Sequence, residues 1–261
     1  MIITLEILKS IRNGESLGSI SRRTGIWKST LYYHYKRIHG KKYKEPKYSI
    51  RFSEKEGEIV GIFAGDGSQV YCKSNCNYQT NIHFGDYKGY ISYVKELYEK
   101  YFNKIWRLNQ DSRKDCCVTY RMRMVDKKIF NYFSNYIDYN PHHKHNTVRL
   151  KTLKVPNRFK IGFIRGLIDT DGTICKERTG RLRIAQYTTS RSLAKQITRI
   201  ITSFEITCYR YERKRKGYKR IYINVISARD IGRFLKTFKP FKGRKFGPVA
   251  QPVERAHGMG D

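Results

Sequence analysis

The sequence predicts an α+β protein made of two similar halves, preceded by a small all-α unit. Three observations lead to this prediction. A glycine-containing apolar segment that ends in Asp-Gly occurs twice, at 57–68 and at 162–173. Segments with strand-like alternation and segments with helical apolar spacing follow both copies. Residues 1–45 carry helical patterns only.

The charge of the chain indicates a polyanionic partner. Lys and Arg number 54 against 22 Asp and Glu among 261 residues, which gives a formal charge of +32. Nucleic acid is the partner class that best relieves such self-repulsion. An anionic membrane surface is the rival, but no basic amphipathic helix with a bulky apolar face supports it. Without a secretory signal, we expect a cytoplasmic, nucleoid-associated protein with reduced cysteines.

Residues 14–38 read as helix, turn and helix. Ile20, Ile26 and Leu31 have the apolar spacing of a helix-turn-helix, and Gly25 falls in the turn. We expect the second helix to enter a DNA groove. It would present Lys28, Ser29, Thr30, Tyr33 and Lys36. The alternative is a plain helical hairpin that covers the rest of the protein.

The two glycine segments are copies in register. Subtracting 105 from the numbers of the second copy places Asp171 on Asp66. Residues four apart share one face of a helix, so each copy forms a ridge of small side chains. The ridges consist of Gly57, Gly61 and Gly65, and of Gly162, Gly166 and Thr170. We expect the two helices to pack backbone to backbone along these ridges.

Such packing brings Asp66 and Asp171 together at the ends of the helices. A helix C-terminus repels negative charge, and neighbouring carboxylates raise each other's pKa. Divalent cations reverse both penalties, and Mg²⁺ prefers carboxylate and phosphate oxygens. The alternative for each Asp-Gly pair is an ordinary turn. Two copies in equal register favour a metal-dependent phosphodiester site.

The segments "IVGIFAGDG" (59–67) and "IRGLIDTDG" (164–172) resemble the LAGLIDADG, or dodecapeptide, motif of homing endonucleases. The first departs from the motif at Ala64 but keeps the catalytic acid as Asp66. The resemblance implies a single chain with two pseudo-symmetric αββαββα repeats that pack through their motif helices. Each repeat would lay an antiparallel sheet in the DNA major groove. We therefore expect the helix-turn-helix at 1–45, the repeats at 46–150 and 151–246, and a disordered tail at 247–261.

The remaining segments follow the order that this resemblance implies. In the second half, strand patterns at 181–189 and 207–226 alternate with helical patterns at 190–204 and 228–238. In the first half, strands are expected at 80–84 and within 104–125, and helices at 90–102 and 126–137. Ser190 is placed to cap the helix that follows it.

Charged residues alternate along the expected strands. Arg121 and Arg123 lie two apart in one strand, as do Arg210, Glu212 and Lys214 in another. We expect these faces to lie on DNA, with Arg and Lys pairing with guanine and Gln79 or Gln186 reading adenine. A solvated sheet face is the alternative reading.

The family also places basic or polar residues near its metals. Aligning the two strand-to-helix junctions pairs Lys127 in "VDKKIF" with Arg229 in "SARDIG". The resemblance implies that these two cations stabilise charge in the transition state.

The resemblance implies a site-specific endonuclease that hydrolyses double-stranded DNA with Mg²⁺, or Mn²⁺ in its place, and leaves 3′ overhangs. Asp66 and Asp171 would hold the metals in a monomeric enzyme that propagates an intron or another mobile element. No splice-junction signature supports an intein. Two alternatives stay open: a transcription regulator that has lost cleavage, and a maturase that binds structured intron RNA.

The last segment, 247–261, differs in composition from what precedes it. The dense use of Lys, Ile and Tyr stops after Phe246, and no apolar periodicity follows. We expect it to pack against nothing. Codons for "GPVAQPVE" can be chosen that resemble the acceptor stem and D-arm of a transfer RNA gene. Our hypothesis is that the reading frame runs into such a gene; coincidence is the alternative.

Overall fold

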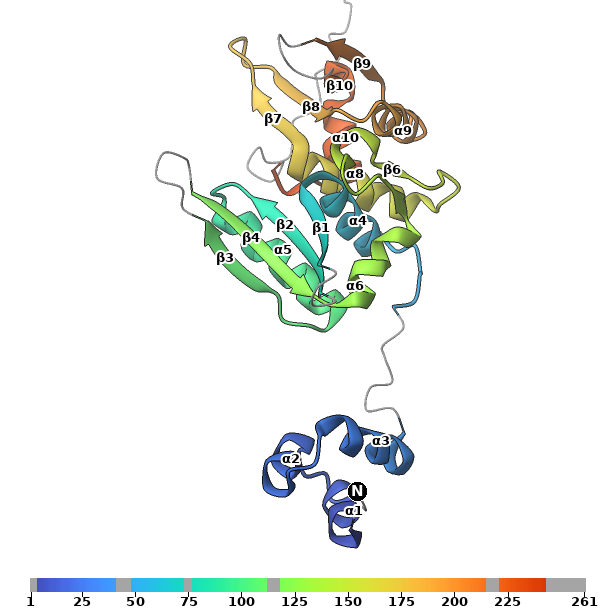
Figure 1. Ribbon diagram of the computed structural model, residues 1–261. Coiled ribbons are helices and arrows are strands. Elements are labelled where there is room, and N and C mark those ends of the chain that lie inside the picture. Colours follow the sequence, from blue (N-terminus) through green and yellow to red (C-terminus); the bar gives the residue numbers. More distant parts are fainter. Residues whose placement is uncertain (1–3, 41–47, 73–76, 112–117, 215–220, 243–261) are drawn as a thin grey trace, which may run out of the picture. The chain divides into compact units, whose positions relative to one another are not determined.

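The computed structural model describes residues 4–40, 48–72, 77–111, 118–214 and 221–242, so the tail expected at 247–261 lies outside the described residues (Figure 1). The chain divides into two compact units, Met1–Ser49 and Ile50–Asp261. Each unit is described by itself below. Within the described ranges, every helix is too short or too polar to span a membrane.

The described residues of the first unit form three helices around a small core of their own. They are α1 (Leu5–Arg12), α2 (Leu17–Thr24) and α3 (Lys28–His39). The core is formed by Ile7, Ile11, Leu17, Ile20, Ile26 and Leu31. Gly25 ends α2 with φ +68°, a left-handed conformation that glycine adopts without strain. The glycine turn between α2 and α3 therefore stands where the sequence predicts it.

The second unit begins with the first αββαββα repeat. Its elements are α4 (Glu54–Asp66), β1 (Gly67–Cys72), β2 (Asn77–Phe84), α5 (Lys88–Phe102), β3 (Arg107–Asp111), β4 (Thr119–Val125), α6 (Lys127–Tyr132) and the 3₁₀ turn η1 (Phe133–Asn135). The strands form an antiparallel sheet in the order β1-β2-β4-β3. Ile82 pairs with Met122 on the face that the helices cover, and both are fully buried.

The second repeat has the same order of elements. They are α8 (Asn157–Asp171), β7 (Gly172–Lys176), β8 (Leu182–Thr188), α9 (Arg191–Thr202), β9 (Cys208–Arg213), β10 (Ile221–Ile226), the 3₁₀ turn η2 (Ala228–Asp230) and α10 (Ile231–Phe238). Its antiparallel sheet has the order β7-β8-β10-β9, which matches the first sheet strand for strand. The predicted α+β fold with two pseudo-symmetric repeats is confirmed, including the Ser190 cap, whose hydroxyl accepts from Leu193 N at 3.2 Å.

A short connection between the repeats was not predicted. It contains β5 (Ile137–Asp138), α7 (Lys144–Thr147) and β6 (Arg149–Leu150), and the two strands pair with each other. The Gln196 side chain on α9 bonds the backbone N–H and C=O of Leu150, each at 2.8 Å. The connection is therefore attached to the second repeat, and it carries α7 toward the ends of the motif helices.

The two motif helices, α4 and α8, touch backbone to backbone as the sequence predicts. A β-carbon on Gly61 would lie 2.3 Å from Phe163 O, and one on Gly162 would lie 1.9 Å from Glu54 O. Real β-carbons do not approach backbone atoms so closely. The two helices therefore pack so closely that only glycine, whose side chain is a hydrogen atom, fits at these positions.

The glycines that follow the two aspartates have a different reason from the one expected. A glycine that follows a helix is usually a stop residue in the left-handed conformation. The φ angles of Gly67 and Gly172 are −79° and −99°, so any residue could adopt this backbone. A β-carbon on Gly67 would instead lie 2.3 Å from the Phe63 ring, and one on Gly172 would lie 2.5 Å from Ile168 O. Close approach selects glycine here, and each strand starts directly after its motif helix.

Candidate active site

Asp66 and Asp171 are the last residues of α4 and α8. They meet across the glycine seam: Asp171 Oδ2 lies 3.2 Å from the point that a β-carbon on Gly65 would occupy. Asp171 is exposed and Asp66 is partly buried. The seam thus presents two carboxylates with access from solvent, at the negative ends of two helices.

The protein raises the pKa of both carboxyl groups. Burial, followed by the charge of Asp171, raises the pKa of Asp66 to about 7, while the charges of Lys144 and Lys242 oppose the shift. Although Asp171 reaches solvent, the protein packed around its carboxyl group partly desolvates it and so raises its pKa, against the same two lysines. Without a cation, this pair holds its negative charge poorly.

Lys144 and Lys242 stand in corresponding places at the two helix ends. Lys144 Nζ donates to Ala64 O at 2.8 Å and to Gly65 O at 3.1 Å in the last turn of α4. Lys242 Nζ donates to Thr170 O at 3.1 Å and to Gly172 O at 2.8 Å around the end of α8. Burial lowers the pKa of Lys144 to about 8, although both aspartates raise it. Each motif helix therefore ends against one aspartate and one ammonium group.

These two lysines take the place that we expected for Lys127 and Arg229. Lys127 begins α6 and holds its Nζ 5.3 Å from the centre of the Tyr78 ring. Arg229 lies in η2, and neither residue is among the cations that shift the pKa of Asp66 or Asp171. The cations beside the aspartates come from segments further along each repeat than the two junctions, and a role of Lys127 and Arg229 in turnover stays a prediction. The offset of 105 residues between the two motif copies maps Lys242 onto Ile137 and not onto Lys144, so the internal repeat of the sequence could not reveal this pair of lysines.

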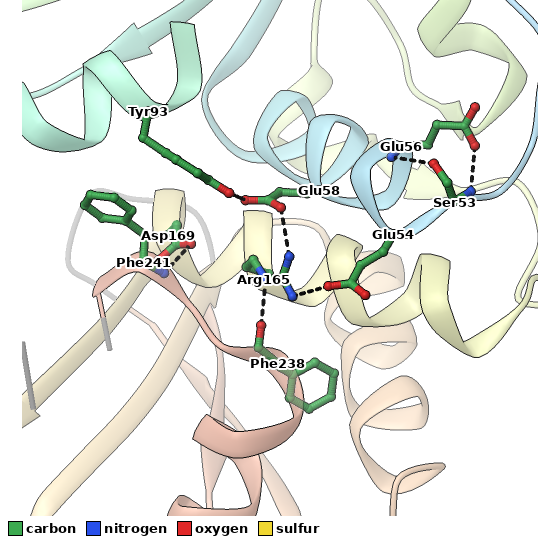
Figure 2. Close-up of polar contacts among 9 residues, drawn as sticks. All are labelled: Ser53, Glu54, Glu56, Glu58, Tyr93, Arg165, Asp169, Phe238 and Phe241. Carbon is green, nitrogen blue, oxygen red and sulfur yellow. Dashed lines mark hydrogen bonds and ion pairs between the residues drawn. The ribbon is translucent and has the colours of Figure 1, made fainter. Parts of the chain in front are cut away.

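A polar network crosses the seam behind the aspartates (Figure 2). Arg165 on α8 forms ion pairs with Glu54 and Glu58 on α4, the second at 2.9 Å. Ser53 and Glu56 form a capping box at the start of α4, which satisfies its first N–H groups. The ion pairs of Arg165 join the two helices whose far ends carry Asp66 and Asp171, and the capping box fixes the start of α4.

The two aspartates suit a divalent cation. Their raised pKa values and the helix C-termini around them favour an added positive charge, and carboxylate oxygens are the ligands that Mg²⁺ and Ca²⁺ prefer. The described ranges contain no group of three or more His, Cys, Asp or Glu side chains that could hold a metal. Asp66 and Asp171 would therefore share a cation with water and a substrate phosphate rather than enclose it.

The first sheet turns a polar face away from its helices. Residues directly opposite each other in antiparallel strands share a face. Arg121 pairs with His83, and Arg123 pairs with Asn81, on the side opposite the buried Met122. The same register adds Gln79, Arg107 and Asn109 to this face. Arg121 and Arg123 therefore lie on the open face, as their alternation indicates.

In the second sheet, the strand pairing places charged residues of β9 on the face that the helices cover. Arg210 pairs with Asn224 and Glu212 with Tyr222, and both partners are buried beneath the helices. Arg210 and Glu212 thus share a face with buried residues, although their own side chains are exposed at the edge of the sheet. Lys214 follows β9 and is also exposed, so its contact with DNA stays a prediction. The open face of β9 instead carries Tyr209, Tyr211 and Arg213. Their partners on β10 alternate with the buried residues and point to the opposite face of the sheet. The alternation along the sequence separates the two faces of β9 but does not indicate which face the helices cover.

Gln186 is unsuited to base contact. Its side chain is 1% exposed. Its Nε2 donates to Tyr187 O at 2.7 Å, and its Oε1 accepts from Asn224 Nδ2 at 3.3 Å. The amide is therefore engaged inside the second sheet, beneath α9, where Thr198 bonds Asn224 at 3.0 Å.

In the first unit, the residues expected to touch DNA begin α3. Lys28, Ser29, Tyr33 and Lys36 are exposed and Thr30 is partly exposed. Trp27, directly before the helix, is 75% exposed, and sequence reasoning did not select it. An aromatic side chain so exposed beside the first turn of α3 enlarges the surface that this helix offers to a partner.

Comparison with known proteins fits this geometry. The family of LAGLIDADG-like domains matches residues 158–239, which hold the second motif helix and its sheet. The chain has the LAGLIDADG fold. The crystal structure of the homing endonuclease I-DmoI in complex with DNA and Mn superposes with a TM-score of 0.54 at 18% identity, covering 72% of this chain and 97% of that chain.

The structure of the homing endonuclease I-WcaI bound to its DNA recognition sequence has a TM-score of 0.50 at 14% identity. That match covers 84% of this chain and 98% of the other. The I-DmoI complex with DNA and Ca gives 0.53 at 18% identity, over 72% of this chain and 91% of that one. The chain matches no curated protein sequence.

Proposed function

We propose that this protein is a site-specific endonuclease that hydrolyses both strands of duplex DNA with Mg²⁺, for which Mn²⁺ can substitute. The observation that carries the proposal is the pair Asp66 and Asp171 at the seam, with one lysine beside each helix end. The charge of +32 and the open faces of the two sheets support DNA as the substrate. The resemblance to homing endonucleases supports 3′ overhangs, a monomeric enzyme, and spread of an intron or another mobile element.

The reaction assigns a task to each residue of the site. Asp66 and Asp171 would hold the cation, which would supply Lewis acidity to the scissile phosphate. Lys144 and Lys242 keep positive charge beside the carboxylates and oppose the negative charge that develops on the phosphate oxygens. With a pKa of about 8, Lys144 stays mostly protonated at pH 7. Arg121 and Arg123 hold the DNA on the first sheet.

Selection of cleaved sites from a random duplex library tests this function. Incubation with Mg²⁺ should enrich one long, asymmetric sequence among the cut ends, and EDTA should abolish the enrichment. The same library without cleavage, selected by binding alone, identifies a regulator. If binding enriches a specific sequence but that sequence stays uncut in Mg²⁺ or Mn²⁺, the nuclease assignment is rejected in favour of a regulator.

We propose a second DNA contact through α3 of the first unit, on the basis of its glycine turn and exposed polar face. Trp27 and Trp106 are the two tryptophans of the chain, and Trp106 is 1% exposed. Quenching of Trp27 fluorescence by duplex DNA flanking the cleavage site should therefore report this contact, and Trp27→Phe should remove the signal. A maturase would instead bind structured intron RNA with the higher affinity, which parallel titrations separate.

A further inference from the structure

The last residue of α10 and the chain that follows it form a strap along the second motif helix. We use the word strap for residues 238–242. Its first backbone carbonyl, Phe238 O, accepts from Arg165 Nε at 2.7 Å. One helical turn further along α8, Asp169 Oδ2 accepts from Phe241 N at 2.8 Å and Asp169 Oδ1 accepts from Lys242 N at 2.9 Å. Figure 2 shows Arg165 and Asp169 reaching the strap from the same helix.

The strap also touches the first repeat. The Phe241 ring packs against α5, with ring centres 5.1 Å from Tyr93 and 5.4 Å from Tyr90. The Tyr93 hydroxyl donates to Glu58 Oε1 at 2.5 Å, and Glu58 is an ion-pair partner of Arg165. The contacts therefore connect the strap, α5 of the first repeat and both motif helices. The strap lies across the seam rather than on one repeat.

Both oxygens of Asp169 are committed to the strap backbone. The residue is 2% exposed, and burial raises the pKa of Asp169 to about 6, while the two N–H donors and the charge of Lys242 oppose that shift. Hydrogen bonds from backbone N–H groups to an ionised carboxylate are stronger than neutral ones. From the backbone that Asp169 holds, the Lys242 side chain reaches Thr170 O and Gly172 O, on either side of Asp171.

The first repeat has no counterpart of this anchor at the same positions. Subtracting 105 from Arg165 and Asp169 gives Val60 and Ala64, which cannot bond a strap backbone through their side chains. Lys144 is instead delivered by the short helix α7. The two lysines thus reach similar places by different routes, and only one route depends on a buried carboxylate of the motif.

We propose that Asp169 is a positioning residue that fixes the backbone of Phe241 and Lys242 and thereby sets the Lys242 ammonium group beside Asp171. The anchoring itself is a property of the folded chain. Its effect on turnover rests on the proposed nuclease function. Two measurements separate the two parts.

Amide hydrogen exchange of the full chain tests the anchoring without DNA or metal. Asp169→Asn keeps the volume but removes the charge, and it turns an NH₂ group toward one of the two N–H donors. Exchange at residues 241–242 should accelerate roughly 10- to 100-fold. Asp126→Asn is the matched control, because Asp126 also accepts two backbone N–H bonds, from Lys128 and Ile129, but at the start of α6. That control should leave 241–242 unchanged.

Cleavage kinetics on the selected site test the positioning. Asp169→Asn should lower the single-turnover rate in the wild-type background and in Lys144→Met, but add no further loss in Lys242→Met. If Asp169→Asn does not fold, Phe241→Leu weakens the other anchor of the strap. It should give the same acceleration of exchange and the same dependence on Lys242.

Each result decides one part of the proposal. Unchanged exchange at 241–242 in the folded variant overturns the anchoring. If exchange accelerates in Asp169→Asn but the wild-type chain cuts no DNA, the anchoring stands and the nuclease function is rejected. An equal loss of rate with and without the Lys242 ammonium overturns the positioning role, because Asp169 would then act through something else.

Discussion

At the scale of single residues, the site joins two acids that hold negative charge poorly to two lysines that compensate for it. The sequence selects the acids by their repeat but cannot select the lysines, since these lie at unequal distances along the two halves. Lys144 bonds carbonyls of one motif helix and Lys242 those of the other. The consequence is a set of mutations that separates turnover from affinity.

Lys144→Met and Lys242→Met should each lower the cleavage rate by roughly 10- to 100-fold with little change in Kd, because their charge matters most when negative charge develops on the phosphate. Lys127→Met and Arg229→Met are the matched controls, since neither charge shifts the pKa of the aspartates. Single-turnover cleavage and equilibrium binding check the split. A larger loss of rate in the control pair would return the catalytic assignment to the strand-to-helix junctions.

Asp66→Asn should stabilise the metal-free protein, and more so at pH 8 than at pH 5.5. The folded pKa of Asp66 is about 7, above its ordinary value of 3.8. Ionised Asp66 therefore destabilises the fold, and this penalty grows as the pH rises from about 4 to about 7 and then stays constant. Urea unfolding in EDTA should show a gain of the order of 1 kcal/mol or more at pH 8.

Asp138→Asn serves as the control for that experiment. Asp138 is exposed and pairs with Arg149 at 2.7 Å, so its replacement should change stability little at either pH. A gain from Asp66→Asn that is equal at the two pH values, or a loss at pH 8, would show that the carboxylate is not strained by its surroundings.

At the scale of elements, the motif helices are the part that the sequence predicts best. The spacing of Gly57, Gly61, Gly162 and Gly166 indicates direct backbone contact, and the distances across the seam bear this out. Strand alternation also located β8, β9 and β10. Alternation alone could not assign the buried face, because a strand with Arg210 on one face and Tyr211 on the other can turn either face toward the helices. The position of α9 decides which face is covered.

The short elements could not be predicted for a related reason. The strands β5 and β6 have two residues each and α7 has four, so none carries a full period of any pattern. Tertiary contacts such as the Gln196 bonds to Leu150 hold them. Lys144 lies in this region, which is why the candidate site was only half visible in the sequence.

Gly61→Ala should destabilise the second unit by about 2–4 kcal/mol, because its β-carbon would lie 2.3 Å from backbone atom Phe163 O and helices cannot separate without losing the seam. Gly232→Ala in α10 is the matched control: its β-carbon meets nothing within 4 Å, so the change should be neutral or stabilise by up to about 1 kcal/mol. Urea denaturation measures both. Similar values for the two variants would mean that the seam tolerates a methyl group.

At the scale of the whole molecule, the protein joins a three-helix unit to a two-repeat unit, each with its own core. Excess positive charge is spread over both units. We infer that the first unit adds affinity and specificity to DNA binding by the second, rather than contributing to the chemistry, because both aspartates and both lysines lie in the second unit.

A chain that begins near Lys47 should therefore fold and cleave, with weaker binding. The slope of log K against log salt should become less steep by about 0.9 for each phosphate that the shortened chain no longer neutralises. Binding isotherms between 50 and 200 mM salt, about the range over which such slopes are resolved, measure the change. If affinity and slope stay the same after truncation, α3 does not contact DNA.

The double variant Asp66→Asn/Asp171→Asn tests most directly whether the two aspartates at the seam carry out the cleavage. On the site selected from the library, with Mg²⁺ or Mn²⁺ present, cleavage of both strands should be lost while specific binding stays within a few fold of wild type. Binding should persist because the acids hold the cation and not the bases, and because removing two negative charges does not weaken attraction to DNA. A double variant that still cuts at the selected site would show that the seam between the motif helices is not where the chemistry occurs.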